Sequence, residues 1–171
     1  MTTRELTRIA LMGTILYVVF HAFSDILYLE LITFTILSFS QVFSRRDTVI
    51  ACVLFASLHM LLHGVMIWNI AYLLIFPAYG FLFASLKRVW KGRTIALALT
   101  AGIGSFLIGQ LVDLPFILFS STITALYLLM GLKTSLIQGC LTFLATLFLY
   151  EPVHRVLLRL KDKCCSQTQE E

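Results

Sequence analysis

Charged side chains are scarce in this sequence. Only 13% of its 171 residues are Asp, Glu, Lys or Arg, whereas an average soluble domain has about 25%. Hydrophobic residues make up 59% of the chain, and the mean hydropathy is +0.92. A chain with so few polar groups cannot cover its own surface in water. This composition excludes a soluble domain.

The long hydrophobic runs also lack any alternation of apolar and polar residues. In lipid, only helices and closed β-barrels satisfy all of their backbone hydrogen bonds. Barrel strands alternate in polarity, whereas the runs here are continuous. The sequence therefore predicts an all-α integral membrane protein, built as a bundle of transmembrane helices.

Motifs of several functional classes are absent as well. The chain has no GxxxxGK[ST] phosphate loop, so it does not hydrolyse ATP by that route. Its four cysteines have no metal-ligand spacing, and Cys52 and Cys140 fall within apolar runs, where cysteine packs as a small residue. We expect no enzymatic activity, no metal and no bound cofactor, with any ATP used by partner subunits. The net charge of +4 does not indicate nucleic-acid binding, because the basic residues form short clusters between apolar runs.

The apolar runs predict six membrane spans within residues 1–163, followed by a polar cytoplasmic tail at 164–171. Six spans place every Lys and Arg except Lys133 on one side, which the positive-inside rule assigns to the cytoplasm together with both termini. The stretch from Asp113 to Leu132 then becomes an apolar outer segment, a partly helical loop suited to act as a lid. The six spans are Thr7–Phe23, Leu27–Phe43, Thr48–Val65, Ile70–Leu86, Thr94 to about Leu111, and a last span that ends near Leu158.

Polar and aromatic residues gather at the predicted outer ends of these spans. Trp68 and Tyr72 lie four residues apart, so a helix would present both rings on one face as walls for a planar ligand. Asp113 lies between apolar residues, where a carboxylate has a high free-energy cost and is usually functional. An interfacial aromatic belt remains the alternative for Trp68. The candidate substrate-binding residues, which favour a neutral or cationic ligand, are His21, Tyr28, Glu30, His63, Trp68, Asn69, Tyr72, Gln110 and Asp113.

Two further patterns lead to weaker hypotheses. His59 and His63 have a spacing that can bind a metal, but we expect them to be hydrogen-bonded within the bundle instead. Phe55 to His59 echoes the FxxxH element of CAAX-type prenyl proteases, although the paired glutamates of those enzymes are missing here. An intramembrane metal-dependent hydrolase is therefore kept as an alternative function.

Small residues on the first span predict a helix contact. Ala10 and Thr14 form a small-xxx-small pair, with Gly13 beside them. This surface is a candidate partner interface, and packing within the monomer is the alternative.

Taken together, these features resemble the substrate-binding (S) components of energy-coupling-factor (ECF) vitamin transporters. The resemblance covers nearly the whole chain and rests on the layout of the spans, on Arg8-Ile9-Ala10, and on the run from Leu62 to Pro77, which is similar to that family's G…W…YL…P stretch. The family's AxxxA interface motif is kept only in part, because Thr14 replaces the second alanine.

The resemblance implies a non-enzymatic protein of the bacterial cytoplasmic membrane. Such a protein binds a vitamin outside and delivers it inward with a transmembrane coupling subunit and two cytoplasmic ATPases. The branch that this chain looks most like is assigned to hydroxymethylpyrimidine or pyridoxine. A membrane scaffold subunit without a ligand is the other alternative.

Overall fold

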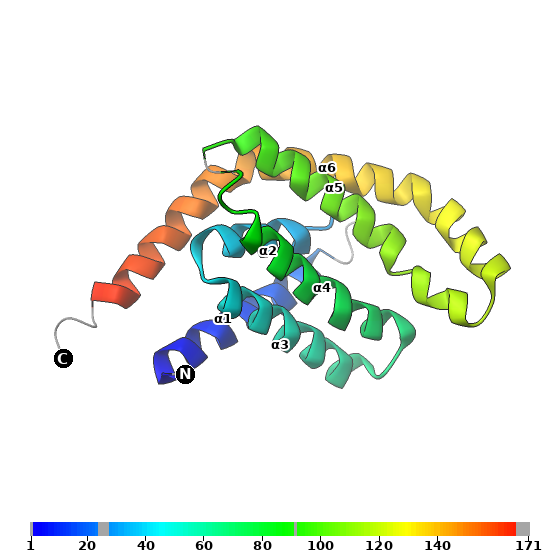
Figure 1. The fold of residues 1–171 in the computed structure, drawn as a ribbon, viewed down its shortest axis with the longest axis horizontal. Helices are drawn as coiled ribbons and strands as arrows, with labels where there is room; N and C mark the ends of the chain where they lie inside the picture. Colours follow the sequence, from blue (N-terminus) through cyan, green and yellow to red (C-terminus); the bar gives the residue numbers. More distant parts are fainter. Residues whose placement is uncertain (1, 24–27, 91, 167–171) are drawn as a thin grey trace.

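The computed structural model describes residues 2–23, 28–90 and 92–166, apart from the side chains of residues 163–166. This part of the chain is predominantly helical and contains no strand. The elements in order are α1 (Thr3–Ala22), α2 (Ile32–Val42), α3 (Arg45–His63), α4 (Ile67–Ser85), α5 (Thr94–Leu111), the 3₁₀ helix η1 (Leu114–Leu118) and α6 (Ser121–Ser166) (Figure 1).

Helix α2 is the centre of the bundle. It contacts each of the other five α-helices, and all eleven of its residues are buried. In Figure 1, α5 and α6 run together along one side of the molecule, α1, α3 and α4 form the other side, and α2 lies between the two groups. At about 1.5 Å per residue, α2 is only about 16 Å long, roughly half the thickness of a bilayer core.

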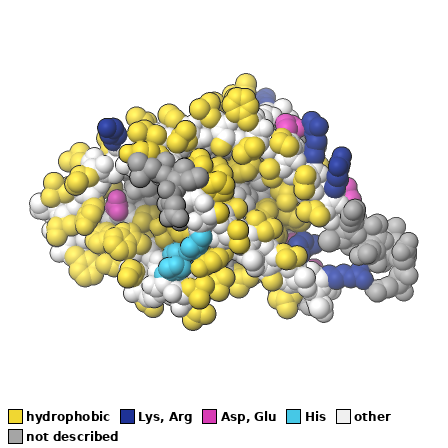
Figure 2. Space-filling view, turned by 180° about the vertical axis from the view of Figure 1, so that it is seen from behind, with side chains coloured by type: hydrophobic (Ala, Val, Ile, Leu, Met, Phe, Trp, Pro, Cys, Tyr) yellow, Lys and Arg dark blue, Asp and Glu magenta, His cyan; other side chains and the backbone are white. Residues whose placement is uncertain are grey.

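Polar side chains on α2 face inward without disturbing the core. The hydroxyls of Thr35 and Ser38 donate to carbonyls four residues earlier, and that of Ser40 donates to the Leu37 carbonyl three residues earlier. Each hydroxyl is thereby satisfied within its own helix, as burial requires. The outer surface of the bundle is apolar, because large aliphatic side chains such as Leu61, Leu74 and Leu118 are exposed. Figure 2 shows this hydrophobic surface over most of one face.

Five helical stretches of the described chain are long and apolar enough to cross a membrane. They are Thr3–Ala22, Arg45–His63, Ile67–Ser85, Thr94–Leu118 and Ser121–Asp162. An apolar surface around a partly polar interior suits lipid rather than water as the solvent. The structure thus agrees with the predicted class, a multi-pass helical membrane protein.

The predicted second span and outer segment differ from the observed elements. Leu27–Phe43 was expected to cross the membrane, but helix begins only at Ile32, and α2 is a short buried helix instead. Of the expected outer segment Asp113–Leu132, residues 121–132 form the first turns of α6 rather than a loop. α6 continues for 46 residues, beyond the start of the predicted tail at 164, and contains Pro152. Figure 1 shows it bending as it approaches the C-terminus.

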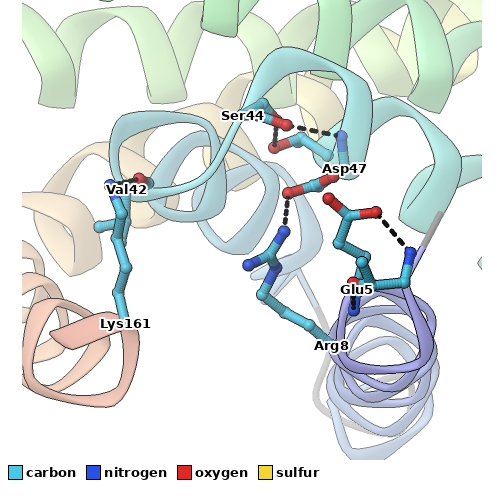
Figure 3. A network of polar contacts seen from close by, with 8 residues as sticks. Glu5, Arg8, Val42, Ser44, Asp47 and Lys161 are labelled. Atoms are coloured by element: carbon cyan, nitrogen blue, oxygen red, sulfur yellow. Dashed lines mark hydrogen bonds and ion pairs between the residues drawn. The ribbon is translucent and has the colours of Figure 1, made fainter. Parts of the chain in front are cut away.

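The basic ends of the helices lie together. The start of α1, the α2–α3 turn, the α4–α5 connection and the end of α6 all belong to one end of the bundle, and Figure 2 shows Lys and Arg side chains gathered toward that end. Figure 3 shows two of the contacts that link these elements: Arg8 on α1 pairs with Asp47 on α3, and Lys161 on α6 donates to the Val42 carbonyl at 3.1 Å. Asp47 is also held by the N-cap of α3, because its backbone N–H donates to the Ser44 hydroxyl.

Candidate ligand-binding site

A cavity of about 200 Å³ lies between the last turn of α1, the start of α2 and the first half of α6. Its walls come from the last turn of α1, the segment that leads into α2, and one face of α6. Phe20 and Phe23 supply aromatic rings, and Thr134 and Gln138 supply polar groups from α6. The lining residues are Val19, Phe20, Phe23, Tyr28, Leu29, Glu30, Leu31, Ile32, Thr134 and Gln138.

Glu30 joins three helices at the base of this cavity. One carboxylate oxygen accepts from the backbone N–H of Thr33, and the other accepts from the hydroxyls of Thr33 and Ser105, at distances of 2.7 to 2.8 Å. The backbone carbonyl of Glu30 accepts from Thr142 on α6, whose hydroxyl also lies 3.0 Å from that of Ser105. A carboxylate at the N-terminus of α2 suits the partial positive charge of that helix end. Glu30 therefore fixes α2 against α5 and α6 at the cavity.

Tyr28 has an unusual backbone conformation beside Glu30. Its φ of 69° lies in the left-handed region, which non-glycine residues seldom adopt. Such conformations persist where the surrounding structure imposes them, and they cluster at ligand sites and switches. Tyr28 itself lines the cavity, together with Leu29, Glu30 and Leu31.

His21 and His63, two other predicted site residues, meet between the last turns of α1 and α3. Their Nε2 atoms lie 3.3 Å apart. Tyr72 on α4 packs nearby, with its ring 5.7 Å from that of His59 and 5.6 Å from that of Phe20. Phe20 also lines the cavity. The cluster formed by His21, His59 and His63 therefore shares this wall with the cavity.

Asn69 has a structural role in the α3–α4 turn. It is buried, and its side chain donates to the Gly64 carbonyl at 2.6 Å. Gly64 ends α3 with a φ of 86°, a conformation that glycine adopts without strain.

The remaining predicted residues lie around η1. The Trp68 ring packs 5.3 Å from that of Phe116, whereas Tyr72 contacts Phe20, His59 and Phe76, so the two rings have different neighbours. Gln110 donates to the Ser135 hydroxyl at 2.9 Å and links α5 to α6. A Cβ added at Gly131 would lie 3.5 Å from an Asp113 oxygen and 3.7 Å from the Gln110 amide nitrogen. Asp113 and Gln110 thus approach the same point on α6.

Sequence reasoning did not single out Phe20, Thr134 or Gln138 as cavity residues, or Ser105 and Thr142 as partners of Glu30. One signal was present: Thr134 and Gln138 are polar, lie four residues apart and interrupt an apolar run, so a helix places them on one face. The partners of Glu30 gave no such signal, because they lie 75 and 112 residues away.

The small residues of α1 face in two directions. Gly13 is buried, and a Cβ there would lie 2.9 Å from the Leu54 side chain of α3, so this glycine serves packing within the monomer. Ala10 and Thr14 are exposed. They lie beside the exposed side chains of Leu11 and Ile15 and form an outward-facing surface of small and aliphatic residues.

A second cavity, of about 530 Å³, lies at the basic end of the bundle. Lys87, Arg88 and Arg93 contribute positive charge to it, and Trp90 and Tyr150 contribute aromatic rings. Partial burial, together with the nearby Lys161 ammonium, lowers the pKa of Lys87. This cavity favours anions, unlike the first.

No family model, curated protein or solved structure matches this chain in the comparisons. Its class therefore rests on its own features: a multi-pass helical membrane protein with an aromatic and polar cavity between α1, α2 and α6.

Proposed function

We propose that this chain is the substrate-binding component of an ECF-type vitamin transporter in the bacterial cytoplasmic membrane. It captures a small ring compound, hydroxymethylpyrimidine or pyridoxine, and passes it inward with a transmembrane coupling subunit and two cytoplasmic ATPases. The observation that carries the proposal is the cavity of about 200 Å³ lined by Phe20, Tyr28, Glu30 and Gln138.

The size and lining of the cavity favour this class of ligand. Sites for drug-sized ligands occupy roughly 300–1,000 Å³, so a smaller cavity selects a single-ring compound over a large conjugated vitamin. Aromatic rings can stack on a heteroaromatic ligand, and Thr134 and Gln138 can supply directional hydrogen bonds. The carboxylate of Glu30 favours a neutral or cationic ligand over an anion.

The position of the cavity also supports uptake. One of its walls is the C-terminal end of α1, which lies away from the basic cluster and which the positive-inside rule assigns to the outer side. The exposed surface around Ala10 and Thr14 would let a partner helix approach α1 closely. A ligand site and a separate partner surface are the two parts that such a component needs.

Ligand binding to purified protein tests the proposal. Hydroxymethylpyrimidine and pyridoxine would be titrated by calorimetry into wild-type protein and into Gln138→Leu and Thr134→Val. We expect one of the two compounds to bind, with at least tenfold weaker affinity in Gln138→Leu, because a lost hydrogen bond inside a cavity is worth about 1.4 kcal/mol.

The control is His154→Ala at the opposite end of α6, which should bind like the wild type. Trp68→Ala and Asp113→Asn test whether η1 belongs to the same site. If neither compound binds, and native mass spectrometry finds no retained small molecule, the vitamin-binding proposal is wrong and a ligand-free scaffold becomes the better description.

A further inference from the structure

We propose that His21, His59 and His63 form a binding site for a first-row divalent metal ion of the Zn²⁺ type. One potential ligand atom from each of these histidines lies within 4.8 Å of the others. They come from the last turn of α1 and the last two turns of α3, and Figure 2 shows histidine side chains gathered at the molecular surface. None of the three histidines lines the proposed vitamin cavity, and the metal site does not depend on that proposal.

Proton counting on His21 and His63 supports a metal. Nδ1 of His21 lies 3.1 Å from the Tyr17 carbonyl, Nδ1 of His63 lies 3.3 Å from the His59 carbonyl, and the two Nε2 atoms lie 3.3 Å apart. Each of these three contacts needs a proton if it is a hydrogen bond, but two neutral imidazoles carry only two. A metal ion between the Nε2 atoms removes the need for a proton there, and both Nδ1–H groups can then donate to the carbonyls.

The separation of the two Nε2 atoms matches tetrahedral coordination. Zn–N bonds of about 2.0–2.1 Å at tetrahedral angles place two ligand nitrogens about 3.3 Å apart. The distance between Nε2 of His21 and Nε2 of His63 is 3.3 Å. Metal-bound histidines commonly donate their other ring N–H to a backbone carbonyl, which fixes the ring orientation. Both rings are placed for that arrangement, since each Nδ1 lies at a carbonyl of the preceding helical turn.

His59 supplies a third and independent observation. Its Nδ1 is buried and has no hydrogen-bond partner among the described residues. A buried polar atom without a partner is uncommon and calls for an explanation such as a bound ion. The His59 ring stacks on that of His63 at 4.4 Å and lies 5.5 Å from that of His21. Three imidazoles with a fourth position open form a common zinc site, and imidazole ligands also suit Cu²⁺ and Ni²⁺.

A metal here would join the end of α1 to the end of α3. Phe20, next to His21, packs 5.1 Å from the His59 ring and also lines the cavity. Metal binding would thus hold the cavity wall formed by α1 in place.

The test uses full-length protein purified through a tag without histidine and stripped of metal with a chelator. Zn²⁺ would be titrated in competition with a chromophoric chelator, and Co²⁺ binding would be followed by its visible absorption. We expect one Zn²⁺ per chain, the intense visible bands of tetrahedral Co²⁺, and a rise in melting temperature with Zn²⁺. His63→Gln and His21→Gln should each weaken Zn²⁺ binding at least 100-fold.

The fourth histidine of the chain, His154, is the matched control, and His154→Gln should bind Zn²⁺ like the wild type. Because His63 is exposed, His63→Gln should keep the metal-free melting temperature, and His21→Gln gives a second variant if it does not. A site of micromolar affinity would be mostly filled at about 10 µM free Zn²⁺. Binding of less than about 0.2 equivalents at that concentration would therefore overturn the proposal. Equal loss of binding in His154→Gln would also overturn it.

Discussion

Gly102 of α5 and Gly139 of α6 pack with their backbones in direct contact. A Cβ added at Gly102 would lie 2.9 Å from the Gly139 carbonyl oxygen, and one added at Gly139 would lie 2.8 Å from the Gly102 carbonyl oxygen. Real Cβ atoms do not approach a backbone oxygen so closely. These two helices share the most extensive contact in the bundle, and the glycine pair sets their separation.

We therefore expect Gly139→Ala to destabilise the protein. The methyl group must push α5 and α6 apart, and overpacking of this kind costs about 1–3 kcal/mol. Thermal unfolding in detergent would measure the loss. The control is Gly131→Ala on the same helix, whose Cβ would meet its nearest neighbour at an ordinary 3.5 Å. A melting temperature for Gly139→Ala equal to that of Gly131→Ala would show that the helices are not in close contact.

Glu30→Ala should destabilise the bundle more than removal of an exposed carboxylate. It leaves the Thr33 N–H and the hydroxyls of Thr33 and Ser105 without their acceptor, at a cost of about 3 kcal/mol. Chemical denaturation would measure the change. Glu151→Ala serves as the comparison, because Glu151 is exposed and its ion pair with Arg155 is long, at 3.8 Å. Similar effects from the two substitutions would contradict the role of Glu30 as a junction between helices.

The two sides of α1 should respond differently to enlargement. Ala10→Trp and Thr14→Trp add bulk to an exposed surface, so they should leave the melting temperature nearly unchanged but reduce co-purification with a coupling subunit at least fivefold. Gly13→Leu should instead lower the melting temperature, because its side chain would collide with Leu54. Unchanged complex formation in both tryptophan variants would exclude this surface as the partner interface.

The lowered pKa of Lys87 predicts a rise in stability at alkaline pH. Partial burial and the neighbouring Lys161 disfavour the charged amine in the folded protein, so Lys87 loses its proton at a lower pH when folded than when unfolded. Between the folded pKa and the ordinary value of about 10.4, the unfolded state binds more protons, and stability increases with pH.

The Lys87→Met variant should lack this contribution. Because Lys87 is only partly buried, the difference between the two proteins should amount to less than about 1 kcal/mol over that window. Unfolding free energies measured from pH 8 to pH 10.5 for both proteins would reveal it. A wild-type stability that falls faster than that of Lys87→Met would show the opposite sign and contradict the assignment.

The candidate site was predictable only in part. Sequence position placed His21 and His63 on the same predicted side of the membrane, because both lie near the ends of apolar runs. It could not show that their rings meet, nor that Tyr28 and Glu30 line a cavity with α6. The expectation for Trp68 and Tyr72 used helical spacing alone. In the structure their rings have different neighbours, because neighbouring helices, not spacing, decide what each ring contacts.

The sequence by itself determined the class of protein and the grouping of basic residues at one end. Both depend on composition and on the order of apolar runs and charges, which are local properties of the chain. Only the tertiary structure decided that the second apolar run forms a short central helix, that Gly102 meets Gly139, and that a cavity lies beside Glu30. These features depend on how helices far apart in sequence pack together, because each is made by atoms from several helices that no single run contains.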